Sequence, residues 1–158
     1  MTRPLKMLKN KSLDEVMQLN LFSPINITRI LNGRGIFNEI GGSIIFISSI
    51  VGLLGQPGKV GYGASKGALI SASKSLALEL ASKKIRVNSV LPAMVKTEMS
   101  INLLEKLPDD AKIKIEDMHP LGIGSPDDVA NAVVFLLSDL SKWITGTSMI
   151  VDGGWTAD

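Results

Sequence analysis

Cysteine is absent from the 158-residue chain, which excludes disulfide bonds and thiolate metal sites. A cysteine-free chain fits a reducing compartment, and we expect the protein to be cytoplasmic. Long apolar runs are missing too, since the longest strongly apolar stretch covers only residues 132–137. A stretch of that length cannot span a bilayer, so the sequence predicts no membrane partner.

An excess of charge of one sign is also missing. The chain has 17 basic and 15 acidic residues, for a net charge of +2. It therefore lacks the basic bias typical of nucleic-acid binding, and no basic run resembles a polybasic membrane patch. With 45% hydrophobic and 20% charged residues, the composition indicates one globular unit, long enough to bury a core.

Strand and helix patterns alternate along the chain, which predicts an α/β fold with a parallel sheet. Apolar and β-branched runs indicate strands at 43–48, 85–91 and 147–151, the first of them covered on both faces. Long helices are expected at about 12–31, 62–82 and 125–138, with a short helix at 101–107 inside a loop over 97–120. Ser12 and Ser125 are the expected N-caps. Residues Asn32 to Gly35 are expected to end the first helix.

The helix expected at 62–82 carries two rows of small residues at a spacing of four, Gly63-Gly67-Ser71 and Ala64-Ala68-Ala72. Such rows let another backbone approach closely. We expect one side of this helix to pack on its own sheet and another on a partner helix. The partner helix would come from a second copy, giving a homo-oligomer, either a dimer or a tetramer.

Tyr62 and Lys66 lie four residues apart and therefore share a helix face. An ammonium beside a tyrosine favours the phenolate, so that the tyrosine can exchange a proton with a carbonyl or alcohol oxygen. Ser48 and Ser49 end the preceding strand, at the carboxyl edge where open α/β sheets bind ligands. The alternative is an ordinary aromatic residue at a helix start beside a solvated lysine.

Two competing motifs are disfavoured. Residues 63–67 also fit G-x-S-x-G, the hydrolase nucleophile elbow, with Asp117 and His119 following as acid and base. The elbow needs a strand directly before its serine, which this sequence lacks, so we expect His119 at the surface or in a lid. The stretch Asp152-Gly153-Gly154 is expected to form a turn that anchors the chain, and no residue cluster predicts a metal site.

With these motifs in place, the chain resembles the short-chain dehydrogenase/reductase family over nearly its whole length. ISSIVGLLGQPGKVGYGASKGAL is similar to the family's catalytic stretch, with a serine thirteen residues before the tyrosine. VMQLNLFSP, IRVNSVLPAMVKTEM, PLGIGSPDDVANAVVFLLSD and WITGTSMIVDGG are similar to its other segments. Within the family, the chain resembles the 3-oxoacyl-acyl-carrier-protein reductase-like members.

The resemblance implies the C-terminal part of a Rossmann-type doubly wound parallel sheet, comprising its last three strands, and an oxidoreductase that uses NAD or NADP. It implies that Tyr62 is the general acid or base and that Lys66 activates it and holds the nicotinamide ribose. Ser49 would position the substrate oxygen, and Asn20 would hold a water in a proton relay. Three residues would face the nicotinamide: Pro92, Val95 and Thr97. Ala93 departs from the family's usual glycine.

Asn20 has a second possible role. Pro24 lies four residues on and has no N–H, so the carbonyl of Asn20 loses its helical partner. That carbonyl is then free to accept a hydrogen bond from water or a lysine. The alternative is that Pro24 only kinks the helix.

A glycine-rich phosphate-binding turn is missing from this sequence. In the family it reads T-G-x-x-x-G-x-G, and the family's N-N-A-G stretch is missing as well. We therefore expect residues 1–158 to be a partial domain, the catalytic half of the enzyme, truncated by roughly ninety residues at about 30 per βαβ unit. The substrate would be a carbonyl or secondary alcohol. The alternative is a non-catalytic remnant or interaction subunit.

Overall fold

The computed structural model describes residues 4–33, 36–37 and 41–157. Its three parallel strands form one sheet in the order β1-β2-β3, with β1 at Gly42–Ile47, β2 at Ile85–Pro92 and β3 at Ser148–Val151. All three strands were predicted from their β-branched runs. The register pairs Ile47 with Val90 and Pro92 with Val151, so the carboxyl ends of the strands meet at one edge.

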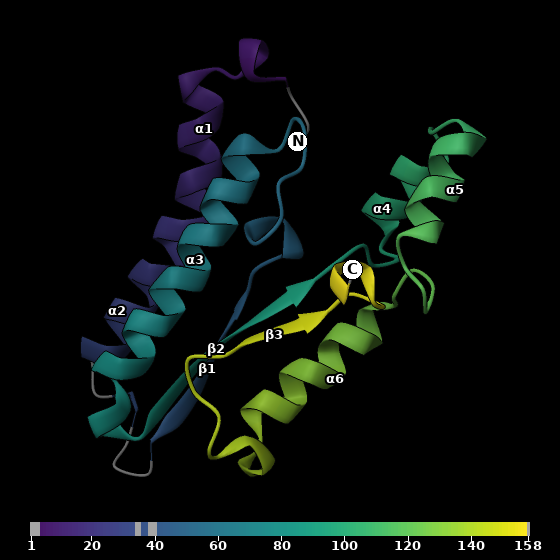
Figure 1. Ribbon diagram of the computed structural model, residues 1–158. Helices are drawn as coiled ribbons and strands as arrows, with labels where there is room; N and C mark the ends of the chain where they lie inside the picture. The colour runs from purple at the N-terminus through teal and green to yellow at the C-terminus, as the bar shows by residue number, and fades with distance from the viewer. Residues whose placement is uncertain (1–3, 34–35, 38–40, 158) are drawn as a thin grey trace.

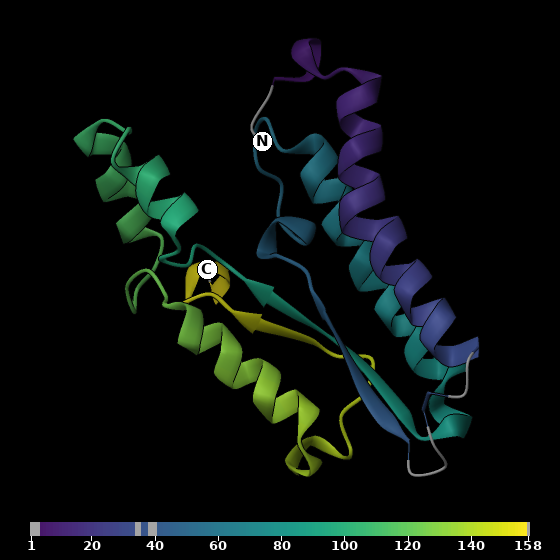
Figure 2. The ribbon, with the colours of Figure 1, turned by 180° about the vertical axis from the view of Figure 1, so that it is seen from behind.

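Helices cover both faces of this sheet, as Figures 1 and 2 show from opposite sides. On one face lie α1 (Asn10–Met17), α2 (Ser23–Gly33) and α3 (Val60–Glu79), and on the other lies α6 (Pro126–Leu137). Two short helices, α4 (Glu98–Leu104) and α5 (Asp109–Asp117), project beyond the carboxyl end of β2. The α/β prediction is therefore confirmed.

The main core lies between α3, the sheet and the helices α1 and α2. Central β2 is covered on both faces, and Val87 and Val90 are fully buried. Each large aliphatic side chain buried in this way contributes about 1.5–3 kcal/mol. The cluster joins residues distant in sequence: Leu21, Phe46, Leu69, Ala77, Leu80, Ile85 and Val87. In the described part of the chain, no helix is both long and apolar enough to cross a membrane.

The edge strand β1 differs from the prediction of a strand covered on both faces. Phe46 is buried, but Ile44 and Ile45 are only partly covered and Ile47 is 46% exposed. The reason is that, within the described part of the chain, β1 has a neighbouring strand on one side only, which is β2.

The first helix also differs in its details. Ser12 is not the N-cap: α1 begins at Asn10, and the carbonyl of Lys9 accepts from the N–H groups of Ser12 and Leu13. A π-helical turn, Gln18–Phe22, then separates α1 from α2. The break expected at Asn32 to Gly35 falls partly on residues 34–35, which are outside the described residues.

The remaining helices agree with the sequence to different degrees. Ser125 caps α6 as predicted, with its hydroxyl accepting from the N–H of Asp128. Residues 97–120 hold two helices rather than one, and α5 was missed. Short 3₁₀ turns complete the chain at Leu5–Met7, Ile50–Gly52, Ala81–Lys83, Asp139–Ser141 and Trp155–Ala157.

Candidate active site

The turn that follows β1 packs directly on α3. A Cβ placed on Gly52 would lie 2.9 Å from the backbone nitrogen of Gly67. A Cβ on Gly63 would meet the carbonyl oxygen of Val51 at 3.1 Å. Part of the small-residue row Gly63-Gly67-Ser71 therefore receives a segment of the same chain. The close approach also places Ser49 and the 3₁₀ turn Ile50–Gly52 against the first two turns of α3.

Both serines at the end of β1 are buried and bonded. The Ser48 hydroxyl donates to the carbonyl of Lys66 at 2.9 Å, which ties the strand to α3. The Ser49 hydroxyl lies 3.4 Å from the carbonyl of Pro92 and accepts from the N–H of Val51 at 3.3 Å. Ser49 thus stands between the ends of β1 and β2, at the carboxyl edge of the sheet.

Tyr62 and Lys66 share one face of α3, as their spacing predicted. The Lys66 ammonium lies 5.8 Å from the centre of the Tyr62 ring and donates to the carbonyl of Ile47 at 2.8 Å. Burial lowers the pKa of Lys66, because part of its hydration is lost. The ammonium is therefore fixed near the tyrosine by the end of β1.

Asn20 reaches the same helix from the π-helical turn. Its side-chain amide donates to the Ser65 hydroxyl at 3.1 Å, and that hydroxyl donates to the carbonyl of Tyr62 at 2.8 Å. The N–H of Ser23 donates to the carbonyl of Gln18, five residues back, so the helix widens just before Pro24. The acceptor role predicted for the Asn20 carbonyl stays a prediction.

The loop after β2 brings the predicted nicotinamide contacts to the same edge. Pro92 ends β2 and pairs with Val151, and Val95 forms a bridge to Gly124. Thr97 is exposed and caps α4, where its hydroxyl accepts from the N–H of Ser100. The structure therefore places Ser49 beside Pro92 and gives Thr97 a clear capping role.

The hydrolase elbow is excluded by the position of its serine. Ser65 lies inside α3 and is fully buried, with its hydroxyl bonded to the carbonyl of Tyr62. His119 is also not where the sequence placed it. The expectation of a surface residue is wrong, because only 3% of His119 is exposed.

Asp152 forms the predicted turn. Its carboxylate accepts from the N–H groups of Gly154 and Thr156, and Gly153 and Gly154 both have positive φ. Partial burial by itself raises the pKa of Asp152, but the hydrogen bonds from Thr156 and Gly154 outweigh it and hold the pKa below its ordinary value. The turn is an anchor, as expected.

The hollows of the described surface do not single out this site. A hollow of about 610 Å³ opens at the amino ends of the strands and is lined by Gly41, Lys84, Arg86, Lys142 and Trp143 among others. A cavity beside Tyr62 holds only about 40 Å³. We assign the site from its hydrogen bonds and not from cavity size, because this hollow is lined by none of the residues Asn20, Ser49, Tyr62 and Lys66. Ser48 was predicted, with Ser49, as a hydroxyl at the carboxyl edge of the sheet, but its bond to the carbonyl of Lys66 was not predicted. Ser65 was not predicted as a positioning residue.

The sequence of the chain was compared with protein families and with characterised proteins, and it is similar to several of them. The family model described as Enoyl-(Acyl carrier protein) reductase matches residues 1–156. The chain is 39% identical over 148 residues to the 3-oxoacyl-(acyl-carrier-protein) reductase FabG of Thermotoga maritima, covering 93% of this chain and 58% of the relative. It is 42% identical over 142 residues to a human (3R)-3-hydroxyacyl-CoA dehydrogenase, covering 89% and 53%. The chain thus spans a little over half the length of these relatives.

Solved structures show the same likeness. A short chain dehydrogenase family protein from Francisella tularensis superposes with a TM-score of 0.90 at 36% identity, covering 100% of this chain and 67% of that one. A 4-hydroxyisoleucine dehydrogenase mutant complexed with NADH and succinate gives a TM-score of 0.91 at 31% identity, covering 99% and 64%. The three-stranded sheet with helices on both faces is therefore part of a Rossmann-type doubly wound sheet.

Proposed function

Because the chain belongs to the short-chain dehydrogenase/reductase family, we propose that it is the catalytic part of an NAD(P)-dependent oxidoreductase. The reaction is the reduction of a carbonyl or the oxidation of a secondary alcohol. One observation supports this most strongly: the Lys66 ammonium is held 5.8 Å from the ring centre of Tyr62, at the carboxyl edge of a parallel sheet.

Each residue has a role in this proposal. Tyr62 passes a proton to or from the substrate oxygen, and the nearby ammonium of Lys66 favours the negative charge that forms on the phenol oxygen. Ser49 orients the substrate oxygen from the end of β1. Asn20, tied to Ser65, holds a water that carries the proton onward.

The residues present fit one end of the cofactor. Lys66 has spare N–H donors for the nicotinamide ribose, and Pro92, Val95 and Thr97 line the loop that faces the ring. When bound, NAD or NADP supplies or accepts the hydride. The pyrophosphate has no glycine-rich cradle in this sequence, so we propose that these 158 residues alone bind the cofactor too weakly for turnover.

The experiment uses the enzyme completed with the amino-terminal segment that its longer relatives carry. Tyr62→Phe should lower turnover by about 10²–10⁴ while nicotinamide binding persists, because only the proton donor is lost. Lys66→Ala should reduce both binding and turnover. If Tyr62→Phe kept near-normal turnover, Tyr62 would not be the general acid.

A non-catalytic interaction subunit is the second candidate, and the exposed part of α3 favours it. Ala64 and Ser71 are exposed on a helix whose other sides are packed, so that a second copy can approach them. Ser71→Arg should weaken a homo-oligomer in sedimentation measurements, whereas Ser82→Arg, beyond the end of α3, should not. An oligomer unchanged by Ser71→Arg would argue against this surface.

A further inference from the structure

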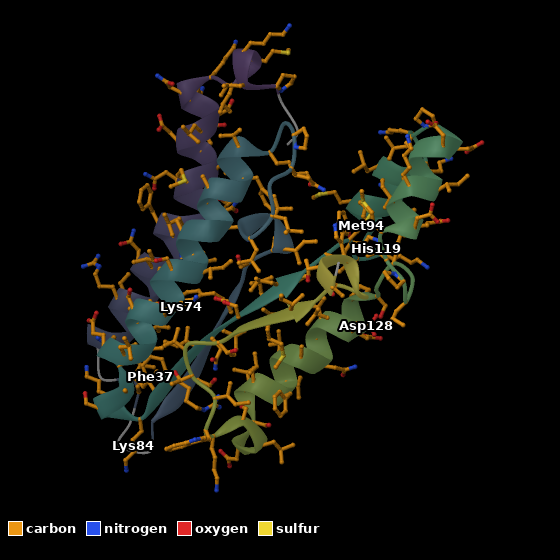
Figure 3. All side chains as sticks on the ribbon, in the orientation of Figure 1. Phe37, Lys74, Lys84, Met94, His119 and Asp128 are labelled. Carbon is orange, nitrogen blue, oxygen red and sulfur yellow. The ribbon has the colours of Figure 1, made fainter. Side chains whose placement is uncertain are left out.

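His119 is the only histidine of the chain, and the proposed chemistry does not use it. It lies where three segments meet: the end of α5, the loop after β2, and the C-terminal turn. Figure 3 shows it beside Met94, below α4 and α5. Its ring is perpendicular to that of Trp155, with 4.7 Å between centres. Only 3% of the residue is exposed.

The two ring nitrogens have partners of opposite kind. Nε2 lies 3.4 Å from the backbone nitrogen of Met94, which can only donate. Nδ1 lies 2.7 Å from the carbonyl oxygen of Ile115, which can only accept. Both bonds form together only in the neutral imidazole that carries its proton on Nδ1. A second proton on Nε2 would face the N–H of Met94 and remove that bond, while the bond to Ile115 would remain.

We propose that His119 is a positioning residue that fixes Met94, within the loop Ala93–Lys96, and frees the N–H of Met94 when the imidazole is protonated. Met94 lies between Pro92 and Val95, so its N–H contributes to the path of the loop, together with the bonds from Ala93 to Val151 and from Lys96 to Gly124. The link to cofactor binding rests on the proposed function, in which this loop faces the nicotinamide. The bond between His119 and Met94 does not depend on that function.

No carboxylate among the described residues forms an ion pair with His119 that would offset the lost bond. The charged side chains on the surrounding segments are exposed or already engaged. Asp152, on the C-terminal turn, accepts from Gly154 and Thr156, and Asp128 accepts from Ser125. The others are exposed, on α5, on the loop and on the first turns of α4 and α6: Lys114, Glu116, Asp117, Lys96, Glu98 and Asp127.

The test is amide hydrogen exchange on the 158-residue chain, expressed as protection relative to the intrinsic rate at each pH. As the pH is lowered until the ring-proton NMR signals of His119 report its protonation, the protection of Met94 should fall roughly three- to tenfold, as expected for the loss of one hydrogen bond. Protection of Met118, whose N–H donates to Lys114 within the same region, should stay constant. Constant protection of Met94, or a parallel loss at Met94 and Met118, would overturn the proposal.

Two variants separate the ring nitrogens. His119→Gln places an uncharged acceptor near the position of Nε2, so Met94 should stay protected at every pH. His119→Asn places a donor near the position of Nδ1 and cannot reach Met94, so Met94 should be weakly protected at every pH. Full, pH-dependent protection in His119→Asn would overturn the proposal. Neither measurement uses cofactor or turnover. A negative result would therefore overturn the role of His119 without bearing on the proposed function.

Discussion

The side-chain amide of Asn20 donates a 3.1 Å hydrogen bond to the hydroxyl of Ser65, a residue 45 positions further along the chain. This bond joins the π-helical turn to α3. Because the Ser65 hydroxyl itself donates to the carbonyl of Tyr62, Ser65 links the side chain of Asn20 to the backbone of the proposed acid. The position of Asn20 is therefore set by a buried serine within the YGASK stretch.

Asn20→Ala should lower the free energy of unfolding by about 0.5–1.5 kcal/mol, the usual net contribution of one hydrogen bond. Ser65→Ala combined with Asn20→Ala should cost less than the sum of the single changes, because each removes the same bond. Chemical denaturation of the four proteins measures the coupling. Ser75→Ala, at an exposed position of α3, is the control. Strict additivity would mean that the bond contributes nothing.

The contact of Gly52 with α3 gives a second prediction. A Cβ at Gly52 would lie 2.9 Å from backbone atoms of Lys66 and Gly67, which cannot move without shifting the helix. Gly52→Ala should therefore destabilise the fold by about 1–3 kcal/mol, the usual cost of overpacking. Gly55→Ala, three residues on, has no atom within 4 Å of its added Cβ and should leave the unfolding midpoint nearly unchanged. Equal effects of the two changes would contradict the close approach.

The strands and α6 could be predicted from sequence because their signals are local. Runs such as Ile44 to Ile47 have a strong β preference, and Ser125 followed by Pro126 is a local helix start. Ser12 has a similar cap pattern, yet the N-cap is Lys9 and the helix begins at Asn10. A side chain alone does not decide which residue first adopts helical angles, because packing of the whole helix competes with the cap.

The burial of His119 and the bond between Asn20 and Ser65 could not be predicted. Both depend on contacts between distant segments, which no spacing in the chain encodes. The roles of the four residues proposed for catalysis come from resemblance to a family. The pairing of Tyr62 with Lys66 also follows from helix geometry, and the place of Ser49 at the sheet edge follows from the strand pattern. The row Gly63-Gly67-Ser71 of α3 shows the same limit, since its spacing predicted a close backbone approach but did not reveal that Gly67 meets Gly52 of the same chain.

Acid should weaken the C-terminal turn through Asp152. Its hydrogen bonds hold the folded-state pKa below the unfolded value of about 3.9. The stability that the carboxylate contributes is thus fully present above that pH and is lost as the pH falls through the folded-state pKa. The difference in unfolding midpoint between the wild type and Asp152→Asn should be larger at pH 7 than at about pH 3. A difference that is constant or grows in acid would contradict the role of the ionised carboxylate.

The open edge of β1 leads to the last prediction, which concerns the 158-residue chain in solution. Among the strands that the structure describes, β1 pairs with β2 alone, and its last residue, Ile47, is 46% exposed. An apolar strand with unpaired backbone groups on one side pairs readily with another chain. We therefore expect the purified chain to self-associate through β1, and to show no measurable affinity for NADH or NADPH.

Sedimentation velocity and calorimetric titration with both cofactors check this expectation. Ile47→Lys places a charge at the open edge and should shift the chain toward monomer, because a lysine on an edge strand opposes pairing. Ile113→Lys is the matched control: Ile113 is 56% exposed, but it lies on α5, away from β1, so this change should leave the association as it is. A stable wild-type monomer that binds either cofactor at micromolar concentration would overturn the prediction, and would require this chain to hold the pyrophosphate without a glycine-rich turn.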